Sequence, residues 1–136
     1  MRLLLDTHIA IWFVTKPAHI GREAFDLIMN SQNKKFVSVG SIWEIAIKHP
    51  LNKRNGAVPF SAHEAIQTFQ QSGFALLDIT PAHAAAVETL PLHHADPFDR
   101  LLVAQALSEP MRLITADAMV ARYSDTIILM EPAAGQ

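Results

Sequence analysis

The chain has 136 residues, half of them hydrophobic, which suffices for one hydrophobic core and is short for two domains. Its formal net charge of -2 gives no sign of a strongly basic surface, which weakens a nucleic-acid-binding role without excluding it, because metal ions in an acidic site would reverse the local field. The chain has no cysteine, which excludes disulfides, thiolate metal sites and cysteine nucleophiles. No stretch approaches the roughly 20 apolar residues of a membrane span, so we expect a cytoplasmic protein with no membrane segment.

The first expected element is a strand at residues 2–6. This apolar run has no face periodicity, as expected of a strand buried on both sides of a parallel sheet. Ligands of open α/β sheets bind at the carboxyl ends of the strands, so Asp6 is a first candidate site residue. Residues 9–14, which include Trp12, are apolar all round and predict a buried or interface-forming helix that ends before Pro17.

The rest of the chain alternates expected helices and strands. We expect helices at residues 22–31, 42–48, 61–71, 81–90, 97–108 and 118–123, and strands at residues 36–39, 74–79, 111–115 and 127–130. This alternation predicts one α/β domain over residues 1–130, with a central parallel β-sheet of four to five strands flanked by helices. Residues 131–136 are expected to be a C-terminal tail.

The segment from Asp96 to Asp99 carries a clear helix-start signal. Asp96 suits the N-cap, Pro97 suits the first helical position, and Asp99 lies three residues after the cap. Both carboxylates can be explained as partners of free backbone N–H groups and of the positive end of the helix dipole. The alternative is that they belong to an acidic pocket, and this segment alone leaves both explanations open.

Three further carboxylates occupy comparable places. Asp6 ends a predicted strand, Glu44 forms a capping-box pattern with Ser41, and Asp117 closely follows another predicted strand. Glu44 and Asp117 could simply stabilise the starts of their helices. Together with the two carboxylates at the later helix start, they could instead form one acidic pocket.

Clustered carboxylates predict a site for a hard divalent cation. They repel one another unless they are protonated or neutralised, and Mg²⁺ or Mn²⁺ is the natural partner of such a set. A cation of this kind commonly shares its coordination with a phosphate, which indicates phosphodiester hydrolysis. The sequence has no nucleophile elbow and no His-x-x-x-His pair, and we expect the adjacent His93 and His94 to be loop residues rather than metal ligands.

The densest positive patch of the sequence is formed by Lys48, Lys53 and Arg54. These residues could contact a phosphate beside the helix that carries Glu44. The alternative is that they form a solvated loop.

Four segments in order, Leu3 to His8, Ser38 to Lys48, His94 to Ala106 and Leu113 to Asp117, resemble the motifs of PIN-domain ribonucleases. Specifically, they resemble the toxin subunits of VapBC-type toxin–antitoxin systems. The resemblance implies a catalytic, metal-binding acidic quartet, Asp6, Glu44, Asp99 and Asp117, with Asp96 as an additional nearby carboxylate. It also implies Mg²⁺-dependent cleavage of RNA, homodimerisation and inhibition by a small cognate antitoxin protein. Residues 49–56 depart from the helix-to-turn pattern of the family.

We therefore expect a Mg²⁺-dependent endoribonuclease that acts as the toxin of a toxin–antitoxin pair. One alternative is a non-catalytic metal- or nucleotide-binding α/β module, and another is an interaction protein whose carboxylates only cap helices. The helix at residues 9–14 predicts a homodimer with this helix near the interface or near the antitoxin groove. The alternative for this helix is burial within the core of the monomer.

Overall fold

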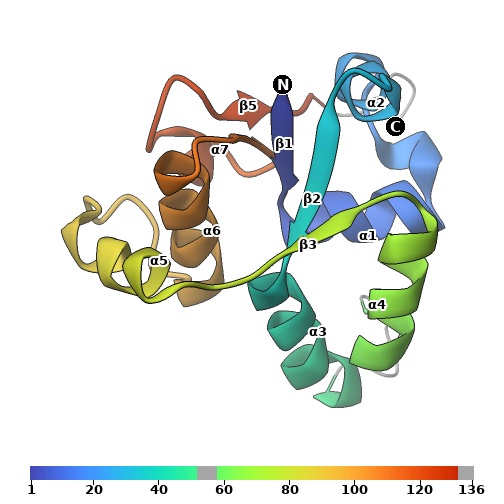
Figure 1. The fold of residues 1–136 in the computed structure, drawn as a ribbon, viewed down its shortest axis with the longest axis horizontal. Helices are drawn as coiled ribbons and strands as arrows, with labels where there is room; N and C mark the ends of the chain where they lie inside the picture. The colour runs from blue at the N-terminus through green and yellow to red at the C-terminus, as the bar shows by residue number, and fades with distance from the viewer. Residues whose placement is uncertain (52–57, 132–136) are drawn as a thin grey trace.

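The computed structural model describes residues 1–51 and 58–131, and its centre is a sheet of parallel strands (Figure 1). The strands are β1 (Arg2–Leu5), β2 (Lys34–Ser38), β3 (Ala75–Leu77), β4 (Arg112–Thr115) and β5 (Ile128–Leu129). Their order across the sheet is β3-β2-β1-β4-β5, so the chain extends the sheet on one side of β1 and then returns to extend the other side. The predicted α/β class and the parallel sheet are confirmed.

Strand β1 lies in the middle of the sheet and is buried on both faces. Leu3, Leu4 and Leu5 are each 0% exposed. Leu3 and Leu5 pack in one hydrophobic core, and Leu4 packs in a second core on the opposite face. Because successive side chains of a strand point to opposite faces, a central strand with two covered faces needs an uninterrupted apolar run. The strand predicted from residues 2–6 is therefore confirmed.

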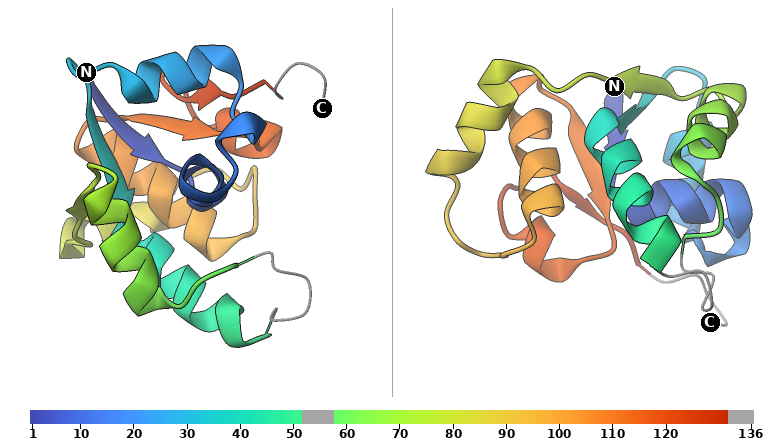
Figure 2. Two further views of the ribbon diagram at one scale, coloured as in Figure 1. Left: turned by 90° about the vertical axis from the view of Figure 1, so that its right-hand side faces the viewer. Right: turned by 90° about the horizontal axis from the view of Figure 1, so that it is seen from below.

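Helices cover both faces of the sheet. They are α1 (Thr7–Thr15), α2 (Arg22–Met29), α3 (Val39–Leu51), α4 (Ala62–Gln71), α5 (Pro81–Ala86), α6 (Pro97–Ser108) and α7 (Ala118–Ala121), with 3-10 turns η1 (Pro17–His19) and η2 (Val87–Thr89). Helices α1, α2 and α4 cover one face, while α6 and α7 cover the other and α5 packs against α6 (Figures 1 and 2). Helix α3 leaves the carboxyl end of β2 and packs against α4 and α6. The result is a three-layer arrangement with the sheet in the middle.

Helix α3 begins at Val39, three residues earlier than predicted. The hydroxyl of Ser38 accepts a hydrogen bond of 2.9 Å from the backbone N–H of Gly40 at this helix start. The capping-box interpretation of Ser41 and Glu44 is therefore wrong, because Ser38 provides the oxygen that serves the first turn. Ser41 lies inside the helix, and Glu44 falls in its second turn, where its carboxylate is not needed for capping.

Pro50 does not end α3, which continues to Leu51. Proline lacks the backbone N–H that would donate to the carbonyl oxygen four residues earlier, so this helical hydrogen bond is absent, but Pro50 is the second-last residue of α3 and little of the helix follows it. The basic residues Lys53 and Arg54, predicted in the turn that follows, lie outside the described residues.

Other elements differ from the prediction mainly at their ends. Strands β3 and β5 are shorter than predicted because each lies at an edge of the sheet and has one neighbour to pair with. The helix predicted at residues 81–90 is divided into α5 and η2. The domain boundary after residue 130 stays a prediction, and residues 132–136 of the predicted tail lie outside the described residues. No helix in the described part of the chain is long and apolar enough to cross a membrane.

Candidate active site

The candidate site lies at the carboxyl ends of β1 and β4. These two strands are neighbours at the point where the order of the sheet reverses, which is where open α/β sheets form a ligand crevice. Asp6 directly follows β1, and its backbone N–H donates to the carbonyl oxygen of Ile114 in β4 at 2.9 Å. Asp117 follows the end of β4 by two residues. The strand pairing thus brings two of the predicted site residues to one edge of the sheet.

Asp6 is buried, with 5% of its surface exposed. Its Oδ2 accepts a hydrogen bond of 2.7 Å from the hydroxyl of Thr115, whereas its Oδ1 has no hydrogen-bond partner among the described residues. Asp6 occupies the N-cap position of α1, but its side chain makes no capping hydrogen bond. Burial raises the pKa of Asp6, and the nearby carboxylate of Glu44 raises it further. Asp6 is therefore a buried acid with one oxygen left free, not a helix cap.

Glu44 is also buried, with 3% of its surface exposed. Its Oε2 accepts a hydrogen bond of 2.6 Å from the ammonium group of Lys48, one turn later on α3, and its Oε1 has no partner in the part of the chain that the structure describes. Burial lowers the pKa of Lys48, but the carboxylates of Glu44, Asp96 and Asp99 outweigh this effect and raise it overall. Lys48 therefore neutralises one buried carboxylate instead of presenting a free cation for a phosphate.

Asp96 and Asp99 have different roles at the start of α6. Asp96 is the N-cap, and its Oδ1 accepts hydrogen bonds from the backbone N–H groups of Phe98 and Asp99 at 2.8 and 3.1 Å. Asp99 lies three residues later and points into the site. Burial and the charges of Asp6 and Asp96 raise the pKa of Asp99 to about 7. The helix-cap explanation is thus confirmed for Asp96, while the carboxylate of Asp99 belongs to the acidic group.

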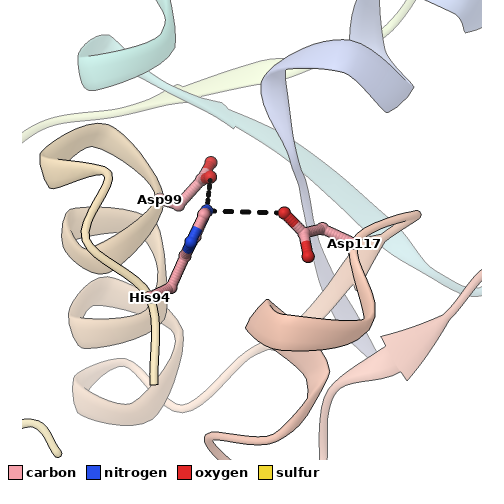
Figure 3. Close-up of side chains that lie close together, drawn as sticks. All are labelled: His94, Asp99 and Asp117. Carbon is pink, nitrogen blue, oxygen red and sulfur yellow. Dashed lines mark hydrogen bonds and ion pairs between the residues drawn. The ribbon is translucent and has the colours of Figure 1, made fainter. Parts of the chain in front are cut away.

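His94 lies between two of the predicted acids (Figure 3). Its Nε2 is 2.8 Å from Oδ2 of Asp99 and 3.4 Å from Oδ2 of Asp117. Asp117 also caps α7, because its Oδ1 accepts a hydrogen bond of 2.8 Å from the backbone N–H of Met119. The carboxylate of Asp117 therefore serves the helix with one oxygen and faces His94 with the other.

The loop position predicted for His94 is confirmed, but the sequence analysis missed that its ring enters the acidic group. A hydrogen-bond network fixes this loop: the hydroxyl of Tyr123 accepts from the backbone N–H of His94 at 3.0 Å and from the guanidinium of Arg100 at 3.0 Å. The guanidinium also donates to the carbonyl oxygen of Pro91 at 3.0 Å. No local signal indicated this position of the ring, because the loop is held by Tyr123, which lies 29 residues away along the chain.

The donor set fits a divalent cation. His94, Asp99 and Asp117 each offer a ligand atom, and these atoms all lie within 4.8 Å of one another. Asp6 joins Asp99 and Asp117 in lining one cavity of about 430 Å³. Buried carboxylate oxygens without a partner, such as those of Asp6 and Glu44, are costly unless a proton or a cation compensates them. The described residues thus combine free oxygen ligands, like charges at short range and an open cavity.

Fold and site together define a class: an α/β protein whose parallel sheet gathers carboxylates at the ends of its inner strands. Within this class, the chain belongs to the PIN-domain family, whose family model matches residues 3–125. The resemblance found in the sequence motifs is therefore confirmed. Such a site is suited to divalent metal ions.

Individual proteins are similar to this chain over most of its length. Ribonuclease VapC22 of Mycobacterium tuberculosis is 29% identical over 118 residues, covering 85% of this chain and 86% of the relative. A solved chain of VapBC2 from Rickettsia felis, bound to a DNA fragment from the promoter, has a TM-score of 0.67 at 15% identity and covers 96% of this chain and 100% of its own length. A chain of a toxin–antitoxin complex from Klebsiella pneumoniae has a TM-score of 0.58 at 18% identity, covering 93% of this chain and 95% of its own. At these identities the solved structures establish the common fold.

Proposed function

We propose that this protein is a Mg²⁺-dependent endoribonuclease that hydrolyses RNA phosphodiester bonds and acts as the toxin of a toxin–antitoxin pair. The observation that carries the proposal is the pair of buried carboxylate oxygens without a partner, Oδ1 of Asp6 and Oε1 of Glu44, beside the cluster of His94, Asp99 and Asp117. The similarity to Ribonuclease VapC22 and the fold shared with chains of toxin–antitoxin complexes support the substrate class and the biological role.

Asp6 and Asp99 would be the principal ligands of the cation, and Glu44 and Asp117 would complete its surroundings. A bound Mg²⁺ or Mn²⁺ would supply positive charge against the scissile phosphate and lower the pKa of the attacking water. Thr115 orients Asp6 by donating to its Oδ2, which leaves Oδ1 available for the cation. Asp96 acts as a positioning residue, because its cap hydrogen bonds hold the first turn of α6, which carries Asp99.

His94 and Lys48 hold the acidic group together before substrate binds. His94 has Nε2 2.8 Å from Oδ2 of Asp99, and this contact fixes the position of the Asp99 carboxylate. Lys48 keeps the carboxylate of Glu44 in place through the 2.6 Å hydrogen bond from its Nζ. The charge of Lys48 reduces the mutual repulsion of the carboxylates, and both contacts support a preorganised site.

We also propose a homodimer and a cognate antitoxin protein as the partners of this chain. The support for the antitoxin is that the solved chains with the same fold come from VapBC and toxin–antitoxin complexes. The apolar character of residues 9–14 is weaker support for the dimer than the sequence implied. Trp12, Phe13 and Val14 of α1 are partly buried and pack against the core of the monomer.

Incubation of the purified protein with single-stranded RNA, with Mg²⁺, Mn²⁺ or EDTA, tests the proposed reaction. We expect internal cleavage in either metal ion and none in EDTA, with sequencing of the product ends to locate the broken bonds. Cleavage that continues unchanged in EDTA would contradict the metal-dependent mechanism. Binding of Mn²⁺ without any cleavage would instead favour the non-catalytic metal-binding module.

A further inference from the structure

The cavity beside the acidic residues has an aromatic wall that the proposed hydrolysis does not use. Asp6, Asp99 and Asp117 line one part of this cavity of about 430 Å³, and His8 and Trp12 of α1 line another. Trp12 lies six residues after Asp6, which is about 9 Å along the helix axis. The indole ring of Trp12 therefore lies apart from the acidic residues but lines the same cavity.

Two imidazole rings flank Trp12. His8 precedes it by one turn of α1, with ring centroids 6.3 Å apart, and His19 of η1 approaches it with a centroid distance of 5.7 Å. Trp12 is partly buried and packs against the core, whereas His8 is exposed. The core contacts and the neighbouring rings restrict the indole, so it forms a fixed aromatic surface at the cavity and not a mobile surface side chain.

An aromatic surface next to a phosphate-binding site matches the chemistry of single-stranded nucleic acid. Proteins bind unpaired bases by stacking them on Trp, Tyr, Phe or His, and this is tolerant of sequence because every base has a π-face. A base inside a duplex is already stacked and paired, so it cannot use such a surface. We propose that Trp12 stacks an unpaired nucleobase of the RNA next to the phosphate bound at the acidic site. This inference rests on the proposed nuclease function, which places that phosphate at the acidic residues.

The other tryptophan of the chain provides a matched control. Trp43 on α3 is 56% exposed, and its ring contacts the edge of Phe98 at a centroid distance of 5.0 Å. Trp43 is not among the residues that line the cavity. An effect that depends on Trp12 and not on Trp43 therefore reports on the cavity and not on aromatic surface in general.

Tryptophan fluorescence measures base stacking without catalysis. Trp43→Phe leaves Trp12 as the only tryptophan, and Trp12→Phe leaves only Trp43. The probe is a short single-stranded RNA, added in EDTA, where the proposed reaction does not run, and in Mg²⁺ at times too short for cleavage, beside an abasic oligonucleotide of the same length and a duplex. We expect the single strand to quench Trp43→Phe and to leave Trp12→Phe unchanged, with no quenching by the abasic or duplex probes. Equal quenching by the abasic probe, or none by the single strand, would overturn the proposal.

Cleavage kinetics separate this proposal from the nuclease function. Trp12→Leu should raise KM about tenfold or more with a smaller effect on kcat, Trp12→Phe should recover part of the loss, and Trp43→Leu should match wild type. Thermal melting shows whether Trp12→Leu is folded, and Trp12→Phe serves as the conservative variant if it is not. Wild-type KM in both Trp12 variants would overturn base stacking while the nuclease proposal stands. Quenching of Trp12 by the single strand in a protein that never cleaves RNA would support the base site while the nuclease proposal fails.

Discussion

Thr115 and Asp6 are joined by a buried hydrogen bond of 2.7 Å from the Thr115 hydroxyl to Oδ2 of Asp6. The same hydroxyl oxygen accepts a hydrogen bond of 3.1 Å from the backbone N–H of Asp117. The side chain of Thr115, at the end of β4, thus fixes both the carboxylate of Asp6 and the backbone of a second acid, Asp117. Because β1 and β4 are paired, this threonine can hold the two acids at fixed positions in the site.

Thr115→Val should test this link, because valine has nearly the same shape and lacks the hydroxyl. Asp6 would lose the hydrogen bond to its Oδ2, and a buried polar group without a partner costs about 1–3 kcal/mol. We expect the free energy of unfolding to fall by this amount and RNA cleavage to fall as well. Denaturant unfolding and a cleavage assay check both. As a control, Thr89→Val removes an exposed hydroxyl at η2 and should change neither the free energy of unfolding nor RNA cleavage. A Thr115→Val protein that behaves like this control would contradict the role assigned to the Thr115–Asp6 hydrogen bond.

Asp99→Asn should stabilise the metal-free protein, and more so at higher pH. The pKa of Asp99 is raised to about 7 in the folded protein, against about 3.9 in an unfolded chain. A raised pKa in the folded state means that the folded protein favours the protonated form of Asp99. The free energy of unfolding therefore falls as pH rises from about 4 to about 7. Each unit of such a shift corresponds to about 1.4 kcal/mol.

Melting curves in EDTA at about pH 5 and about pH 8 measure this effect. The advantage of Asp99→Asn over wild type should grow between the two pH values. The exposed Asp26, in a surface pair with Arg22, provides the control variant Asp26→Asn, which should show no such growth. An Asp99→Asn protein that melts below wild type in EDTA at both pH values would show that Asp99 serves the helix and not an acidic cluster.

Asp96 should behave differently from Asp99 although both lie in one helical turn. Asp96→Asn keeps a good N-cap residue, so stability and cleavage should stay close to wild type. Asp96→Ala removes the oxygen that accepts from Phe98 and Asp99, and we expect a loss of about 1 kcal/mol in the free energy of unfolding. Urea unfolding of the two variants measures the difference. Loss of Mn²⁺ binding in Asp96→Asn would make Asp96 a ligand and contradict its assignment as a positioning residue.

The predicted homodimer is tested by light scattering. A dimer should scatter with a mass twice the 15.0 kDa of one chain. Because Trp12 packs against the core of its own monomer, we expect Trp12→Ala to keep the dimer mass. Conversion of this variant to a monomer would place α1 in the interface, as the sequence first implied. A wild-type protein that stays monomeric at high concentration would contradict the dimer altogether.

The sequence predicted the fold well because the fold depends on local signals, while the metal-binding role of the acidic residues stays a prediction. An apolar run such as Leu3 to Leu5 is typical of a central parallel strand, and the cap signal of Asp96 is contained within four residues. The capping role predicted for Ser41 was wrong because two serines, Ser38 and Ser41, could each cap α3. Which of them caps the helix depends on where the preceding strand ends.

His94 could not be placed from sequence for a different reason. The orientation of its ring depends on contacts with Arg100 and Tyr123, and Tyr123 lies 29 residues away along the chain. The Lys48–Glu44 pair is different, because an i,i+4 spacing on one helix is a local pattern that already favours this ion pair over a phosphate contact. Side-chain partners that come from distant segments require the tertiary structure.

The measurement that tests the central claim most directly is Mn²⁺ binding by calorimetry, run in parallel with RNA cleavage, on wild type, Asp6→Asn, Asp99→Asn and Asp96→Asn. If the acidic cluster holds the cation that cleavage requires, Asp6→Asn and Asp99→Asn should lose Mn²⁺ binding and cleavage together, while Asp96→Asn should keep both. An Asp99→Asn protein that binds no Mn²⁺ yet cleaves RNA at the wild-type rate would contradict the claim.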